Sequence, residues 1–78
     1  MEINLNIFFN NKKYLSNNDK CGCVKCFKVF TANDIKNWTD QGITALCPFC
    51  NTDLIVSEVT FPNLDENVIK KINNIIFN

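Results

Sequence analysis

The most informative property of this 78-residue sequence is what it lacks: it contains no histidine and no arginine. Without histidine, imidazole acid–base catalysis is excluded, and any metal ligand has to be a cysteine or a carboxylate. The absence of arginine counts against a strong nucleic-acid binder, because arginine forks are the usual readers of phosphate and guanine. The sequence also shows no nucleophile–base pair and no glycine-rich phosphate loop. We therefore predict that the protein is not an enzyme and has no catalytic residues.

Long apolar runs are also missing. No stretch approaches the roughly 20 apolar residues that span a bilayer, and residues 1–7 lack the basic start and apolar core of a secretory signal. We therefore expect a cytoplasmic protein that does not enter a membrane. In a reducing compartment, paired cysteines indicate metal ligands or redox groups rather than disulfides.

Cysteine, in contrast, is abundant: the chain has five, although a domain of this size has only a marginal core. Four of them form two Cys-x-x-Cys pairs, Cys23/Cys26 and Cys47/Cys50, with residues 27–46 between the pairs. A tight turn within each pair can bring both sulfurs to one side of a metal ion. This constellation predicts one structural zinc ion (Zn²⁺) with four cysteine ligands.

The residues beside the second pair fit this interpretation. Pro48 restricts φ within the turn. Asn51 stands where many such turns carry glycine, and asparagine is the next best residue at positive φ. We therefore expect Asn51 to adopt a left-handed conformation.

Other interpretations of the cysteines stay open. A rubredoxin-like iron site uses similar turns, whereas a thioredoxin-like redox pair requires the motif at the start of a helix that follows a strand. Free buried cysteines would not explain two pairs at matched spacing. Cys21 is an alternative ligand, because it lies two residues before Cys23, but the symmetry with the second pair favours Cys23.

The hydrophobic pattern predicts a small α+β, zinc-ribbon-like single domain with a short antiparallel sheet. Its expected parts are an N-terminal strand and polar segment (1–20), a two-knuckle zinc core (21–59) and a C-terminal amphipathic helix (60–78). We expect strands over 2–9, 27–30, 43–46 and 54–59, and a helical turn over 12–16 that buries Leu15. A short helix should run from a Thr31 cap to Trp38, followed by a left-handed turn at Gly42. The last helix should have Asn63 as its N-cap.

Charge is balanced overall but not along the chain. The segment from Lys12 to Lys36 holds six lysines against two aspartates, and the remainder of the chain is acidic. These lysines could form one basic face that contacts nucleic acid: Lys12, Lys13, Lys20, Lys25, Lys28 and Lys36. Trp38 and the phenylalanines could stack on bases, but core positions explain most of them better.

The cysteine motif and its surroundings resemble a known family. The stretches Cys-Gly-Cys-x-x-Cys (21–26) and Thr-Ala-Leu-Cys-Pro-x-Cys (44–50), together with Phe61-Pro62 before the last helix, look like a family of small uncharacterised cytoplasmic zinc-knuckle proteins from bacteria and their phages. Members tend to carry glycine where this chain has Asn51. The resemblance implies the metal site and the fold, and it implies no activity.

Apolar residues at both ends of the chain indicate a contact surface. Consecutive apolar residues cannot all face inward, so some of these are expected at a partner or self-association face: Phe8, Phe9, Ile75, Ile76 and Phe77. The leading hypothesis is a protein-interaction module, in one version a phage or mobile-element protein that inhibits a host or defence factor. Nucleic-acid binding through the basic segment is the alternative, and a homodimer is compatible with either.

Overall fold

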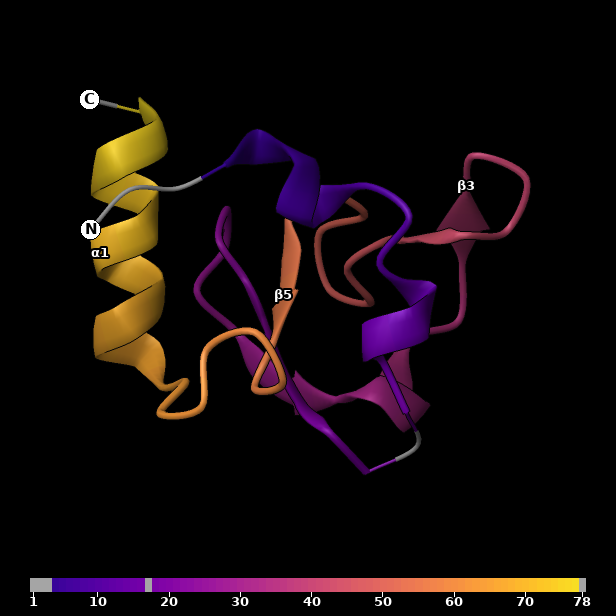
Figure 1. Ribbon diagram of the computed structural model, residues 1–78, viewed down its shortest axis with the longest axis horizontal. Coiled ribbons are helices and arrows are strands. Elements are labelled where there is room, and N and C mark those ends of the chain that lie inside the picture. The colour runs from indigo at the N-terminus through magenta and orange to yellow at the C-terminus, as the bar shows by residue number, and fades with distance from the viewer. Residues whose placement is uncertain (1–3, 17, 78) are drawn as a thin grey trace.

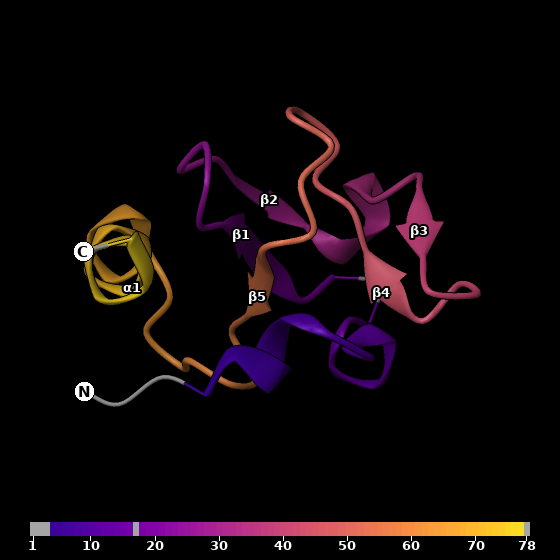
Figure 2. The ribbon, with the colours of Figure 1, turned by 90° about the horizontal axis from the view of Figure 1, so that it is seen from above.

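A three-stranded antiparallel sheet lies at the centre of the protein, described by a computed structural model for residues 4–16 and 18–77. Its strands are β1 (Lys20–Cys23), β2 (Val29–Thr31) and β5 (Ile55–Ser57), in the order β2-β1-β5; β5 is labelled in Figure 1 and all three strands in Figure 2. A separate hairpin, β3 (Trp38–Thr39) with β4 (Thr44–Ala45), lies beside the sheet (Figure 2). Helix α1 (Glu66–Phe77) completes the predicted small α+β fold.

The central strand β1 is buried on both faces, so its residues alternate between two parts of the core. Cys21 and Cys23 belong to the part that contains the cysteine pairs. The next residue, Val24, belongs to the part under α1, together with Val56 of β5. This double burial explains why Cys-Gly-Cys lacks the polar–apolar alternation of a half-exposed strand.

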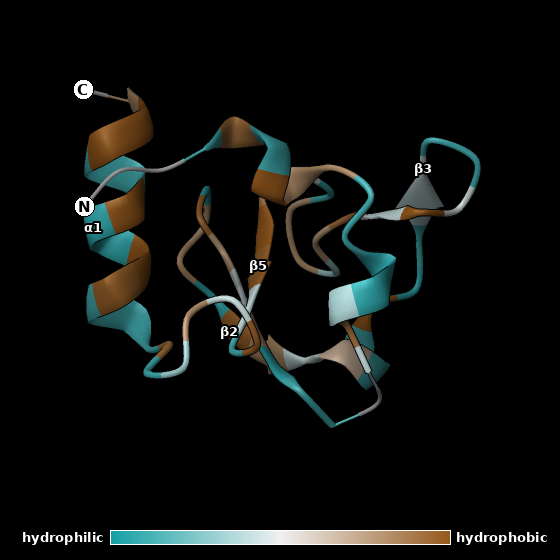
Figure 3. Ribbon diagram, in the orientation of Figure 1, coloured by the Kyte–Doolittle hydropathy of each residue, from teal (hydrophilic) through white to brown (hydrophobic). Residues whose placement is uncertain are grey.

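Helix α1 (Glu66–Phe77) covers one face of the sheet, and hydrophobic and hydrophilic residues alternate along its ribbon (Figure 3). Ile69 and Ile72 are fully buried. A Cβ added at Gly22 would overlap Ile69 Cδ1 and lie 3.1 Å from Ile69 Cγ1. Gly22 therefore lets the helix approach β1 closely.

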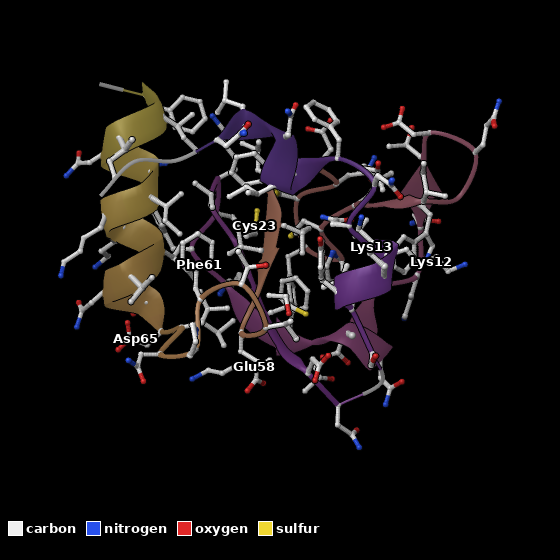
Figure 4. All side chains as sticks on the ribbon, viewed as in Figure 1. Lys12, Lys13, Cys23, Glu58, Phe61 and Asp65 are labelled. Atoms are coloured by element: carbon white, nitrogen blue, oxygen red, sulfur yellow. The ribbon has the colours of Figure 1, made fainter. Side chains whose placement is uncertain are left out.

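The start of α1 differs from the prediction. Asp65, not Asn63, caps the helix: Asp65 Oδ1 accepts a hydrogen bond from the N–H of Val68 at 2.9 Å. Asp65 lies at the base of the helix in Figure 4. The predicted N-cap, Asn63, is wrong by two residues, because Glu66 is already the first helical residue.

The predicted N-terminal strand is also wrong over its described part. Residues Leu5–Phe8 form the 3₁₀ helix η1, while residues 2 and 3 lie outside the described part of the chain. The Asn4 side chain accepts a hydrogen bond from the N–H of Asn6 at 2.9 Å and starts this turn. The turn carries Phe8 into the core under α1, which a strand presenting Leu5 and Ile7 inward could not do.

The middle of the chain is more extended than predicted. The expected helix shrinks to one turn, η3 (Ala32–Asp34), in which Asp34 Oδ2 accepts from the N–H of Thr31 at 3.2 Å. The chain is extended from Ile35 (φ −75°, ψ 120°), because Trp38 pairs with Ala45 in the β3–β4 hairpin. Pairing within the hairpin thus overrides the local helical signal.

The remaining boundaries are close to those expected. The predicted strands over 27–30, 43–46 and 54–59 shorten or shift to β2, β4 and β5. The helical turn is confirmed as η2 (Lys12–Tyr14), and Leu15 is buried after it. Gly42 has φ +89° as predicted, but its turn closes the hairpin instead of ending a helix.

Asn11 links the central sheet to the hairpin. Its buried side chain donates through Nδ2 to the carbonyl of Ile55 at 3.1 Å and accepts at Oδ1 from the N–H of Ala45 at 3.0 Å. Both bonds span more than 30 residues of sequence, so neither is visible in local patterns. Through Asn11, the polar N-terminal segment therefore connects β5 of the central sheet to β4 of the hairpin.

Candidate metal centre

The four cysteines of the two pairs come together. Their Sγ atoms, from Cys23, Cys26, Cys47 and Cys50, all lie within 4.8 Å of one another. Two of these distances are 3.6 Å (Cys23 to Cys50) and 3.7 Å (Cys26 to Cys47). Four sulfurs about 2.3 Å from one tetrahedral ion are about 3.8 Å apart. The cluster can hold one metal ion in a zinc-ribbon-like arrangement.

The two turns that carry these sulfurs have the same backbone hydrogen bonds. In the first, the N–H of Cys23 donates to the carbonyl of Lys28 at 3.0 Å, and the N–H of Phe27 donates to the carbonyl of Cys23 at 2.9 Å. In the second, Cys47 pairs in the same way with Thr52 and Asn51, both at 2.9 Å. Equal spacing in the sequence thus produces two equivalent knuckles.

The residue after each second cysteine is left-handed. Asn51 has φ +63°, as predicted. Phe27 occupies the matching position in the first knuckle with φ +67°, where a bulky side chain is unusual. Sequence reasoning did not identify Phe27, because only the matched geometry of the knuckles shows that this position requires positive φ.

Backbone N–H groups point at the sulfurs. The N–H of Phe49 lies 3.3 Å from Cys47 Sγ. Burial raises the pKa of the Cys47 thiol, and the N–H groups of Phe49 and Cys50 oppose this. Burial likewise raises the pKa of the Cys23 thiol against the N–H groups of Cys26 and Lys25. Both turns therefore offer donors to a thiolate that a metal ion would stabilise.

Cys50 differs from the other sulfurs because it is exposed. Its slight burial would raise the pKa of its thiol, but the hydroxyl and N–H of Thr52, followed by the thiols of Cys23 and Cys47, outweigh burial and lower this pKa to about 7. The Thr52 Oγ1 atom lies 3.2 Å from Cys50 Sγ. Thr52 is a supporting residue that sequence reasoning missed.

Elements on both sides hold the first knuckle. Asn73 of α1 donates through Nδ2 to the carbonyl of Val24 at 2.8 Å, and the N–H of Val24 donates to the carbonyl of Leu54 at 2.9 Å. Figure 4 places Cys23 near the middle of the molecule. The helix and the strand segment before β5 thus position the sulfurs of Cys23 and Cys26.

Cys21 does not join the cluster. It is fully buried, and its Sγ lies 3.4 Å from the carbonyl oxygen of Asp19. Burial, followed by the negative charges of Asp19, Glu58 and Asp34, raises the pKa of the Cys21 thiol to about 12. Because β1 advances about 3.3 Å per residue, Cys21 lies roughly 7 Å along the strand from Cys23. The sulfur cluster therefore contains Cys23 and not Cys21.

Two of the candidate nucleic-acid lysines, Lys12 and Lys25, lie at different ends of the molecule. Lys12 Nζ lies 5.6 Å from the centre of the Trp38 ring, on the hairpin side. Lys25 Nζ lies 5.6 Å from the centre of the Phe77 ring, at the end of α1. Helix α1 and strand β3 lie on opposite sides of the central sheet (Figure 1). These two lysines therefore do not share a face.

The apolar residues of the predicted partner surface have different environments. Phe8 is a correction: it is 1% exposed and forms part of the core, so it cannot contact a partner. Ile76 packs against the same core and is only partly exposed. Phe9, Ile75 and Phe77 are exposed, with Phe77 at 51%.

Over residues 4–16 and 18–77, no helix has the length and apolar character that a membrane span requires. No family model, curated protein or solved structure matches the chain.

Proposed function

We propose that the protein is a zinc-stabilised, non-enzymatic protein-interaction module. The observation that carries the zinc assignment is the sulfur cluster, whose Sγ–Sγ distances of 3.6 and 3.7 Å suit one tetrahedral ion. Four thiolates favour zinc or iron over hard cations such as magnesium. They would also fill every position of a tetrahedral ion, which leaves no place for a substrate and supports a structural role.

Metal analysis of protein purified without added metal tests this assignment. We expect one zinc per chain, and iron in its place would support the rubredoxin-like alternative. Cys23→Ser should lose the metal, whereas Cys21→Ser should keep one ion per chain, because only Cys23 belongs to the cluster. Loss of metal from Cys21→Ser alone would contradict the ligand set.

The interaction role is supported by an apolar end patch, defined here as Leu5, Phe9, Ile75 and Phe77. Each of these side chains is at least 42% exposed. They come from η1, the residue after it and the last turns of α1, and both elements contribute to one core cluster, η1 through Phe8 and α1 through Ile69 and Ile72. Exposed apolar groups gathered on neighbouring elements are typical of contact surfaces.

A pull-down from source-cell lysate, with sedimentation of the purified protein, tests the patch. Ile75→Ser with Phe77→Ser should remove a stoichiometric partner or dissociate a dimer. Val59→Ser is the matched control, because Val59 is 54% exposed and lies outside the patch. A monomer that recovers no partner, or equal loss in both variants, would contradict the proposal.

The resemblance to bacterial and phage zinc-knuckle proteins adds one version of this proposal, in which the partner is a host or defence factor that the chain inhibits. A recovered partner should then lose activity when the protein is added. Nucleic-acid binding by the segment from Lys12 to Lys36 stays a prediction, and the separation of Lys12 from Lys25 does not favour it. Binding that weakens steeply with salt would support it.

A further inference from the structure

A groove on the N-terminal segment lies outside the metal centre and shares one residue, Phe9, with the apolar end patch. It has a volume of about 480 Å³, within the range of roughly 300–1,000 Å³ typical of small-molecule sites. Its lining comes mainly from η1, η2 and the residues between them. Six lining residues carry the argument: Asn4, Asn6, Phe9, Asn10, Lys13 and Tyr14.

The groove has aromatic side chains that the core does not use. Phe9 is 50% exposed and Tyr14 is 41% exposed, although the neighbouring Phe8 and Leu15 are buried. An exposed aromatic ring offers a surface on which another flat ring can stack. Two such rings beside one groove favour a planar ligand.

The polar lining favours a ligand with hydrogen-bonding edges and negative charge. Asn4, Asn6 and Asn10 provide side-chain amides, which can both donate to and accept from a base edge. Lys13 provides the cation, and its Nζ lies 5.1 Å from the centre of the Tyr14 ring. Among the described residues, no carboxylate lines the groove, so its charge is suited to an anion.

We propose that this groove binds one nucleotide, with the base stacked on Tyr14 and Phe9 and the phosphate near Lys13. The amides would contact the edge of the base, and single-strand binders combine aromatic and cationic groups in the same way. The nucleotide could be free or part of a single strand. This site uses Lys13 and does not require the six lysines from Lys12 to Lys36 to form one basic face.

Two titrations of the zinc-loaded full chain test the proposal at low salt. Amide NMR shifts are followed with the four nucleoside monophosphates and, separately, with an eight-nucleotide single strand. We expect saturable shifts confined to residues 4–14 and around Thr60. Tighter binding of the strand identifies nucleic acid as the source, and equal affinity identifies a free nucleotide.

Variants separate the groove from general surface effects. Tyr14→Ala should weaken binding by about tenfold, since loss of one base stack has an effect of this order. Lys13→Gln should also weaken it, more for nucleotides than for the corresponding nucleosides. Val29→Ala and Lys71→Gln are matched controls, because both residues are exposed and lie outside the groove lining.

Several results would overturn the proposal. One is the absence of shifts at millimolar nucleotide and at about 100 µM strand. Another is inorganic phosphate that binds as tightly as a nucleotide, which would mean that the base is not recognised. A third is an equal loss of binding in the control variants. If only a protein partner shifted the amide NMR signals of the groove residues, the groove would be assigned to protein interaction instead.

Discussion

At the residue scale, the left-handed positions after the two knuckles show how backbone geometry limits residue choice. Asn51 and Phe27 have nearly the same φ, +63° and +67°, in turns with the same hydrogen bonds. Asparagine tolerates this conformation better than other residues with a side chain. Phenylalanine does not, but Phe27 packs partly against the core under α1, which offsets the backbone strain.

Asn51 allows a direct test of this conformation, because its side chain is exposed. Asn51→Gly should stabilise the zinc-loaded protein by up to about 1 kcal/mol, since glycine adopts positive φ without steric cost. Asn51→Ala should destabilise it by about 1 kcal/mol for the opposite reason. Urea unfolding at fixed metal concentration measures both, and equal stability of the two variants would contradict the argument.

Asn11 gives a second prediction at this scale. Asn11→Ala leaves the carbonyl of Ile55 and the N–H of Ala45 without their partner in a buried place. We expect a loss of about 1–3 kcal/mol of unfolding free energy. Asn67→Ala is the control, because Asn67 is exposed on α1. A loss no larger than that of the control would show that Asn11 does not bridge the two sheets.

At the element scale, the sequence predictions are most accurate for features whose geometry depends on residues close together in the chain. The knuckles, the left-handed Asn51 and Gly42, and the apolar face of α1 all depend on residues a few positions apart. Apart from the cap of α1, which is a local choice between Asn63 and Asp65, the failures depend on contacts outside the segment itself. Phe8 enters the core under α1 and turns the expected strand into η1, and the pairing of Trp38 with Ala45 ends the expected helix.

The N-cap of α1 can be tested directly, because the sequence pattern and the structure assign it to different residues. Asp65→Ala should destabilise the protein by about 0.5–2 kcal/mol, because it removes the acceptor for the N–H of Val68 and a negative charge at the helix N-terminus. Asn63→Ala should have little effect. Thermal unfolding of the two variants decides, and a larger loss from Asn63→Ala would restore the cap predicted from the sequence.

At the scale of the whole molecule, the metal centre lies between the two hairpin-forming halves of the chain. Cys23 is the last residue of β1 and Cys26 lies in the turn before β2, whereas Cys47 and Cys50 follow the β3–β4 hairpin. A bound ion would therefore join segments that otherwise meet through Asn11 and a small core. Metal binding and folding should be coupled.

The pH dependence of zinc binding follows from the thiols. Burial raises the pKa of Cys23 and Cys47 above the ordinary value, so both are protonated at neutral pH without metal. Zinc binds the thiolates and releases these protons. Affinity should therefore rise from pH 6 to pH 8 and fall as pH is lowered. A competition titration against a chelator of known affinity measures the zinc affinity at each pH. Calorimetry in buffers of different ionisation enthalpy measures how many protons zinc binding releases. A pH-independent affinity would contradict a thiolate site.

Removal of the metal is the strongest test of whether the fold depends on the bound ion. Zinc binding to structural sites of this kind is worth about 10–16 kcal/mol, more than the core of a small domain normally supplies. We therefore expect a strong chelator to unfold the chain, with loss of its circular dichroism signal and of dispersed amide NMR shifts, and added zinc to restore both. Verified zinc-free protein that keeps its native spectrum would show that the core and Asn11 suffice without the ion.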